Sequence, residues 1–316
     1  MKVGLMLGGG GAKGAYQLGV LKALEQYNLI NQIDCISGAS IGALNGYFYL
    51  SSLNINRVID SWRYGINNNP IQIKKRNRKK EENETGLFSL QVLREMNKMY
   101  LDPHLFEQTK IDLFVSTTKV VNPKLSGVVM RWKWENDIIH LNQSDFPFED
   151  AISSSSVPIV FGTNRVRNSY YIDGGLTNNN PVDILINQGC DVILGVSLDN
   201  KCNYKKYKEH HVTLINLTSR EALPKTAIKR YVAALNFNLE LFENRIEYGY
   251  YATTEMIKEC ISKGVFKLDH QQVKICENGG VFKIIDVPDY INANIKIMCS
   301  NKESQLRKKE RNHGNN

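Results

Sequence analysis

The sequence predicts an α/β fold with three layers, in which helices cover both faces of a central, mostly parallel sheet, followed by a C-terminal helical appendage. Short apolar runs suited to buried strands occur at 3–7, 33–37, 113–118, 192–198 and 212–217. Segments with the spacing of amphipathic helices separate most of these runs. Strands that alternate with helices in this way form parallel sheets whose two faces are both covered.

The first expected strand runs directly into a glycine-rich loop. The loop reads Gly8-Gly9-Gly10-Gly11-Ala12-Lys13-Gly14, and a segment with helical spacing follows at 15–27. Successive backbone N–H groups at a helix start can converge on an anion. We therefore interpret the loop as an anion-binding turn, although a turn that only permits close packing would have the same composition.

Three kinds of anion-binding site fit such a loop to different degrees. A nucleotide P-loop is excluded because Gly14 follows Lys13 where Ser or Thr is needed. Dinucleotide binding fits the spacing of Gly9, Gly11 and Gly14. It also requires an acidic residue at the end of the second strand, whereas Asp34 stands at the start of its strand. The third use is an oxyanion hole, and nothing in the sequence contradicts it.

The second expected strand ends in a G-x-S-x-G pattern formed by Gly38, Ala39, Ser40, Ile41 and Gly42. A residue held at a tight turn between strand and helix projects its side chain clear of the sheet, and glycines two places on either side let the backbones approach. The helix expected after it points unpaired N–H groups back toward the serine. The pattern therefore makes Ser40 a candidate nucleophile, and an ordinary glycine-rich turn is the alternative.

In the middle of the chain, expected helices at 43–53, 55–64 and 87–100 flank a polar insertion at about 67–84. A later apolar strand ends at Asp173-Gly174-Gly175, which holds a carboxylate in a tight loop. Asp-Gly is also a strong turn signal by itself.

From 227 to about 261 a long amphipathic segment predicts helix. We divide the chain into a domain at 1–220, a helical extension at 221–300 and a disordered basic tail at 301–316.

The charge of the chain is uneven. Its 316 residues are 42% hydrophobic and 23% charged, as in a globular protein, and the net charge is +8. Much of the positive charge lies in two runs, at 74–80 and 302–311. We expect both runs to be solvated, with an anionic lipid surface as the alternative partner. Nucleic acid is not indicated, because neither run contains interleaved aromatic residues.

The six cysteines carry no metal or redox signature. No two of them form a C-x-x-C pair, so we expect no metal and no cofactor. Reduced thiols favour the cytoplasm. The apolar stretch at 3–7 is too short for a secretion signal, and no apolar run approaches the roughly 20 residues of a membrane span. We therefore expect a cytoplasmic protein whose contact with a membrane, if any, is peripheral.

Taken together, the ordered motifs resemble the signature of the patatin-like phospholipases. That signature is a G-G-G-x-(K/R)-G loop, then G-x-S-x-G, then D-G-(G/A), and the three stand here at Gly9–Gly14, Gly38–Gly42 and Asp173–Gly175. Asn179-Asn180-Pro181 and the segment 155–161 also resemble the family. The resemblance covers about residues 3–220, and it implies a patatin-like fold with motif support from Ala12, Lys13, Gly14, Gly38, Ala39, Gly42, Gly174 and Gly175.

The resemblance implies a serine hydrolase that cleaves acyl esters of membrane phospholipids. Ser40 would be the nucleophile and Asp173 the general base of a Ser–Asp dyad, with an acyl-enzyme intermediate. The oxyanion hole would be formed by N–H groups of Gly9, Gly10 and Gly11, with that of Ile41. Lys13 would orient the loop, draw in an anionic head group, or lie in solvent. No histidine is needed, since none stands in a motif.

Three other functions stay open from the sequence. An esterase or thioesterase acting on soluble acyl substrates would use the same residues. A Rossmann-type dinucleotide-binding protein would use only the glycine loop. A catalytically silent scaffold would bind lipid through its basic segments.

Overall fold

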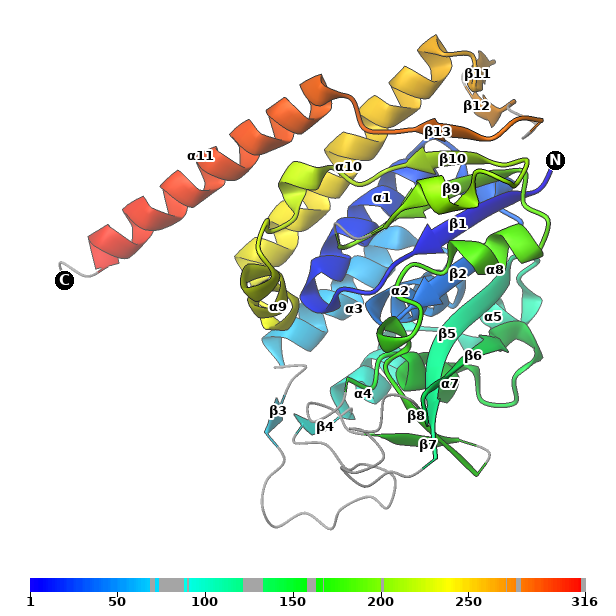
Figure 1. Cartoon of the computed structure of the whole chain (residues 1–316). Helices are drawn as coiled ribbons and strands as arrows, with labels where there is room; N and C mark the ends of the chain where they lie inside the picture. Colours follow the sequence, from blue (N-terminus) through cyan, green and yellow to red (C-terminus); the bar gives the residue numbers. More distant parts are fainter. Residues whose placement is uncertain are drawn as a thin grey trace.

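A computed structural model gives the arrangement of the chain (Figure 1). The residues it describes are 1–68, 72–73, 88–89, 91–121, 133–157, 163–166, 168–199, 202–270, 272–276 and 280–313. The basic run at 74–80, most of the insertion expected at 67–84 and the end of the segment 155–161 lie outside them.

Within the described residues, a nine-stranded sheet forms the centre of the molecule, in the order β13-β10-β9-β1-β2-β5-β8-β7, with β6 also pairing to β5. The strands from β13 to β5 are parallel, and β6, β7 and β8 are antiparallel additions. The strands are β1 (Val3–Leu7), β2 (Cys35–Ala39), β5 (Asp112–Val120), β6 (Glu135–His140), β7 (Asn164–Val166), β8 (Ser169–Ile172), β9 (Val192–Val196), β10 (Thr213–Asn216) and β13 (Lys283–Ile285).

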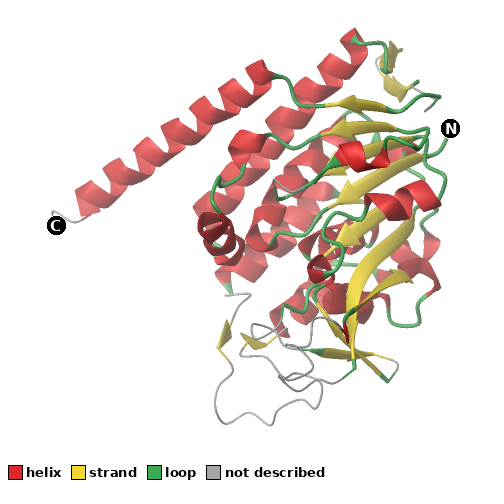
Figure 2. Cartoon of the chain, in the orientation of Figure 1, coloured by secondary structure: helices red, strands yellow, loops and turns green. Residues whose placement is uncertain are grey.

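Alternate side chains of the central strands enter two different hydrophobic cores, because successive residues of a strand point to opposite faces. In β1, Leu5 and Leu7 belong to one core and Met6 to the other. In β9, Leu194 and Ile193 divide in the same way. Both faces of the sheet are therefore buried, and the predicted three-layer α/β/α fold is confirmed (Figure 2).

The larger core lies under α1 (Ala15–Gln26), α2 (Ile41–Leu50), α3 (Ile55–Asn67) and α10 (Leu239–Ser262). The smaller core lies on the other face, under α8 (Val182–Asn187) (Figure 1). Asparagine side chains begin two of these helices: Asn54 accepts from the N–H of Asn56 at α3, and Asn238 accepts from that of Leu241 at α10. Shorter helices are α4 (Gln91–Tyr100), α5 (Pro103–Gln108) and α7 (Pro147–Ser154), and two-residue strands are β3 (Gln72–Ile73) and β4 (Phe88–Ser89).

The C-terminal part is more closely joined to the sheet than an appendage would be. The segment expected as one helix at 227–261 forms two, α9 (Ala227–Leu235) and α10, and a hairpin of β11 (Phe266–Asp269) and β12 (Gln272–Ile275) follows. Strand β13 then pairs with β10 at the edge of the main sheet. The division of the chain at residue 220 stays a prediction, but the part beyond it supplies a strand to the central sheet.

The expectation of a disordered tail at 301–316 is wrong for most of that tail. Helix α11 spans Asp289–His313 and points away from the sheet (Figure 1). Its first half buries Ile291 and Ile295 in the larger core, and Lys302 pairs with Glu247 of α10 at 3.1 Å. Long-range packing of this kind is invisible in a local charge pattern. In the described part of the chain, no helix is both long and apolar enough to cross a membrane.

Strand register brings the loops of the three central strands to one level. Leu7 stands opposite Gly38 of β2 and Val196 of β9. The residues that follow these strands, including Gly8 and Ser40, therefore meet at the carboxyl edge of the sheet. In open parallel sheets this edge is where ligands bind.

Candidate active site

Ser40 lies at a sharp turn between β2 and α2. Its backbone has φ 54° and ψ −126°, a conformation that non-glycine residues rarely adopt. Such conformations cost about 1–3 kcal/mol and persist only where the surroundings enforce them. The side chain is largely buried, at 7% exposure. The turn is the one that the G-x-S-x-G pattern predicts.

Backbone crowding explains both glycines of that pattern. A Cβ atom at Gly38 would lie 2.7 Å from the backbone N of Ala43, and one at Gly42 would lie 2.0 Å from the carbonyl oxygen of Leu7. Real Cβ atoms do not approach other atoms so closely. The close contact of α2 with the end of β1 therefore requires glycine at 42.

Asp173 follows β8 and faces the serine. The Ser40 hydroxyl donates to its Oδ2 at 2.5 Å, and the N–H of Gly175 donates to its Oδ1 at 2.8 Å. The Thr118 hydroxyl holds the Asp173 carbonyl oxygen at 2.9 Å. A Cβ at Gly174 would lie 1.8 Å from the Ser116 carbonyl oxygen, so only glycine fits beside the aspartate. The loop fixes the carboxylate between strand β5 and the Ser40 turn.

Burial raises the pKa of Asp173 to about 6, while its hydrogen bonds with Ser40 and Gly175 act in the opposite direction. A buried carboxylate is harder to ionise because the charged form loses its hydration. At neutral pH the group is still mainly ionised, but it is a stronger base than an exposed aspartate. This combination suits a residue that accepts a proton from a hydroxyl.

The glycine loop passes beside the serine. A Cβ at Gly9 would lie 3.1 Å from that of Ser40. However, the Gly9 N–H already donates to the Asn179 carbonyl oxygen at 3.0 Å, so the prediction of Gly9 as an oxyanion donor is wrong for this structure. The N–H groups of Gly10, Gly11 and Ile41 make no hydrogen bond with any residue that the structure describes. They are the amides left to receive an anion.

Lys13 is not a solvated side chain, which was one of the options for it. It is 6% exposed, and its ammonium group donates to the Leu198 carbonyl oxygen at 2.5 Å. Leu198 stands just beyond the end of β9. Lys13 therefore ties the glycine loop to the neighbouring strand, as the orienting role requires. Ala12 is also buried, and its carbonyl oxygen accepts from Arg245 at 3.0 Å.

The supporting roles of two side chains were not predicted from the sequence, although Asn179 was part of the resemblance to the family. The Ser40 N–H donates to the Ser154 hydroxyl at 2.8 Å, and that hydroxyl donates to the Ser116 carbonyl oxygen at 2.7 Å. On the other side, the Asn179 amide donates to Asp199 at 2.7 Å and to the Gly9 carbonyl oxygen at 3.3 Å. The run of serines at 153–156 was the only local signal for the first support.

Neither alternative use of the motifs gains support from the geometry. Asp34 accepts from the N–H of Val3, at the amino end of the sheet and away from the glycine loop, where it could not reach a dinucleotide ribose. Among the described side chains, no histidine bonds to Ser40 or Asp173: His104 pairs with Glu107 and His140 with Asp112. Among the described residues, no group of three potential metal ligands occurs.

The comparisons with known proteins agree with this geometry. The chain belongs to the patatin-like phospholipase family: the model of that family matches residues 5–186, more than half of the chain. This confirms the resemblance carried by the three motifs, and it identifies the chain as an enzyme of the lipid hydrolase class.

Relatives differ widely in how much of them the chain covers. The probable lipid hydrolase 463L of Invertebrate iridescent virus 6 is 26% identical over 245 residues, which are 74% of this chain and 76% of that protein. Lysophospholipase nte1 of Aspergillus terreus is 53% identical over 53 residues, 17% of this chain and 3% of that protein. Neuropathy target esterase sws of Drosophila persimilis is 46% identical over 61 residues, 19% and 4% respectively.

Two solved structures are similar to the chain at low identity. Human GIVD cytosolic phospholipase A2 matches with a TM-score of 0.47 and 10% identity, over 81% of this chain and 61% of that one. VipD from Legionella pneumophila matches with a TM-score of 0.40 and 15% identity, over 82% and 67%.

Proposed function

We propose that this protein hydrolyses acyl esters of membrane phospholipids, with Ser40 as nucleophile and Asp173 as general base. The observation that carries the proposal is the hydrogen bond from the strained, buried serine to a carboxylate whose pKa is raised to about 6. A hydroxyl becomes a useful nucleophile only with a base in contact, and here the base is the aspartate itself. The family and the named lipid hydrolases among its relatives point to lipid substrates.

The reaction follows from the positions of these groups. Ser40 Oγ attacks the ester carbonyl carbon while its proton passes to Asp173 Oδ2. The negative charge on the carbonyl oxygen is stabilised by the N–H groups of Gly10, Gly11 and Ile41. The tetrahedral intermediate expels the alcohol, which takes the proton from Asp173, and leaves an acyl-serine. Water then attacks the acyl-serine while Asp173 again accepts a proton. The second tetrahedral intermediate expels Ser40 Oγ, which takes this proton back from Asp173, and the fatty acid is released.

Two substitutions test the dyad. Ser40→Ala and Asp173→Asn remove the nucleophile and the base with little change in volume. Both proteins are expected to fold and to lose about 10⁴-fold or more in kcat on long-chain phospholipid vesicles. A fluorophosphonate probe is expected to label the unmodified protein but not the Ser40→Ala protein. Turnover close to normal in the Asp173→Asn protein would contradict the assignment of the base.

The substrate class is tested separately from the dyad. Hydrolysis is measured on phosphatidylcholine vesicles and on short soluble acyl esters and thioesters at equal molar concentration. We expect faster release of fatty acid from the vesicles. The same dyad with preference for the soluble esters would replace the phospholipase proposal by an esterase. We also propose that the protein acts in the cytoplasm and reaches its substrate by peripheral contact with a membrane.

A further inference from the structure

Helix α9 (Ala227–Leu235) exposes three large aliphatic side chains to solvent. Ile228 is 78% exposed, Val232 58% and Leu235 39%. Residues four and three apart lie on one side of a helix, so the three form a single stripe. Leu239, at the start of α10, is 38% exposed and follows the stripe. Isolated exposed apolar residues are ordinary, but a continuous stripe of them on one helix is typical of an interaction surface.

The opposite side of α9 rests on the glycine loop through small residues. A Cβ at Gly11 would lie 2.3 Å from the Ala234 carbonyl oxygen, so α9 lies directly on the loop. Arg245 joins the two, donating to the Ala12 carbonyl oxygen at 3.0 Å and to that of Ala233 at 3.3 Å. A helix that covers a core points its large apolar residues inward. In α9, Ala233 and Ala234 are half-buried, whereas the branched residues Ile228, Val232 and Leu235 are exposed.

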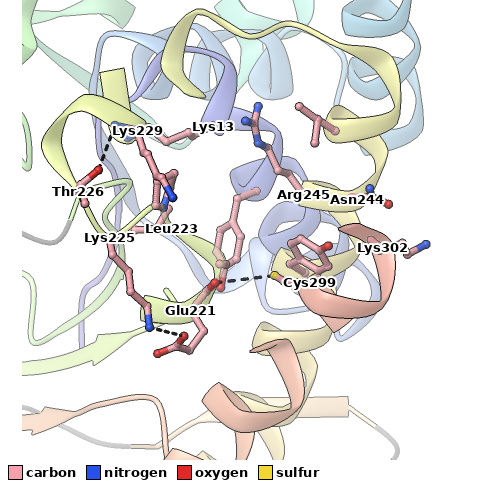
Figure 3. A pocket seen from close by; sticks show the side chains of 15 residues that line it. Lys13, Glu221, Leu223, Lys225, Thr226, Lys229, Asn244, Arg245, Cys299 and Lys302 are labelled. Carbon is pink, nitrogen blue, oxygen red and sulfur yellow. Dashed lines mark hydrogen bonds and ion pairs between the residues drawn. The ribbon is translucent and has the colours of Figure 1, made fainter. Parts of the chain in front are cut away.

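A basic cavity of about 410 Å³ opens beside α9 (Figure 3). Ser40 is not part of its wall. Its cationic side chains are Lys13, Lys225, Lys229, Arg245 and Lys302, whereas Glu221 is the one carboxylate among the described residues that line it. Lys225 pairs with Glu221 at 3.3 Å. Lys229 is exposed, and residues 222–235 contain no Asp or Glu. The residues that line the cavity beside the stripe therefore carry more positive than negative charge, although Lys302 is paired with Glu247 of α10.

A small, mostly apolar slot of about 10 Å³ lies between the segment that follows α9 and the glycine loop. Phe237, from the segment between α9 and α10, lines the slot together with Phe242, Trp62, Gly11 and Ile41. Gly11 and Ile41 are two of the residues whose N–H groups make no hydrogen bond with any residue that the structure describes.

We propose that α9 docks the protein on a bilayer of anionic phospholipid, with Ile228, Val232 and Leu235 inserted among the acyl chains. The basic cavity beside it faces the lipid phosphates. An interfacial helix combines an aliphatic stripe with flanking lysines, which is the composition found here. The stripe is aliphatic and narrow, with positive charge at its side, so a negatively charged lipid surface complements it. The proposal rests on the proposed function only in taking a bilayer as the source of substrate.

Co-sedimentation with vesicles tests this docking. The whole protein is mixed with vesicles of phosphatidylcholine alone and with vesicles that also contain phosphatidylglycerol. We expect stronger binding to the anionic vesicles, and a loss on raising the salt concentration. Replacing Ile228→Asn and Val232→Asn together should weaken binding by about tenfold or more, since two inserted aliphatic side chains are lost. Lys229→Gln should lower only the preference for anionic vesicles.

Matched controls come from the far end of the molecule. Leu268 in β11 is 65% exposed, and Lys208 is also exposed, so Leu268→Asn and Lys208→Gln change the same residue types away from α9. Neither control should alter vesicle binding. Binding by the Ile228/Val232 double variant equal to that of the unmodified protein would overturn the proposal, as would an equal loss in the Leu268 control or selective capture by an acidic protein instead of vesicles.

Activity on a short soluble ester separates the two proposals. Because Ile228 and Val232 touch neither Ser40 nor Asp173, their variant should keep its rate on the soluble ester and lose rate only on vesicles. If that variant hydrolyses vesicles at the unmodified rate, the docking proposal is wrong and the phospholipase proposal stands. Vesicle binding without hydrolysis of any ester would do the reverse.

Discussion

The carboxyl edge of the sheet around Ser40 and the outer side of α9 differ in what determines their residue types. Around Ser40 the backbones approach so closely that Gly42 and Gly174 have no room for a methyl group. On α9, Ile228 and Val232 meet solvent and contribute nothing to the core. In the first region the packing of the fold dictates the residue type. On the outer side of α9, packing does not restrict the residue type. We infer that the surface to which α9 binds determines it.

The largest effect is expected from filling the space at the crowded edge. Gly42→Ala would place a methyl carbon 2.0 Å from the Leu7 carbonyl oxygen, and we expect a loss of about 3 kcal/mol or more in the free energy of unfolding. Gly264→Ala is the control, because no atom lies within 4 Å of its added carbon although its φ is +71°. The control should lose only about 1–2 kcal/mol. Equal urea midpoints for the two variants would contradict this account of the edge.

The next effect concerns the pH dependence of activity. The base must be ionised to accept the Ser40 proton, and burial raises the pKa of Asp173 to about 6. We expect kcat/KM on a soluble ester to be level above that pH and to fall about tenfold per pH unit well below it. The assay uses a neutral ester, and circular dichroism monitors folding at each pH. A profile that is level from about pH 5 to about pH 8 would show that a different group is the base.

Asp173→Asn is expected to stabilise the protein at neutral pH. The native pKa of Asp173 is raised above its unfolded value, so ionisation favours the unfolded chain. Its contribution to stability is fully present below about pH 4 and is lost as the pH rises through about 6. The uncharged variant should therefore exceed the unmodified protein by about 1–3 kcal/mol at about pH 8. Urea unfolding at that pH and at about pH 4 measures the difference, and an advantage that did not shrink on acidification would exclude this cause.

The smallest effect on stability is expected on α9. Ile228→Asn and Val232→Asn remove no buried contact, so the free energy of unfolding should change by less than about 0.5 kcal/mol. Ile36→Asn is the contrasting change, because Ile36 is fully buried in β2, and this variant is expected to unfold. If the α9 variants unfolded like Ile36→Asn, the comparison between the two regions would be wrong.

The parts of the site that the sequence predicts are those determined by local crowding. The turn at Ser40 and the loop at Asp173 depend on glycines within a few residues, so short sequence patterns are enough to predict them. Gly9 was assigned wrongly because the partner of its N–H, Asn179, lies 170 residues further along the chain. The support from Ser154 was missed for the same reason, since it stands 114 residues beyond Ser40.

For the fold, too, features with local causes were predicted and features that depend on distant contacts were not. The alternation of strands and helices predicted the three layers, because the spacing of apolar residues and the length of each segment are local properties of the sequence. The disordered tail was expected from the run of charges at 302–311, whereas residues 301–313 continue helix α11, whose first half packs on the core through Ile291 and Ile295. Strand β13 is only three residues long, and its place in the sheet depends on its pairing with β10.

The pairing of β1 with β9 has a consequence for how the chain folds during synthesis. Strand β1 lies at the centre of the sheet, between β2 and β9, and the Gly8 N–H bonds to the Val196 carbonyl oxygen. A nascent chain that ended at residue 186, where the family match stops, would hold Ser40 and Asp173 but leave β1 as an unpaired edge. Strand β1 can therefore pair on both of its edges only after synthesis has passed Val196 of β9.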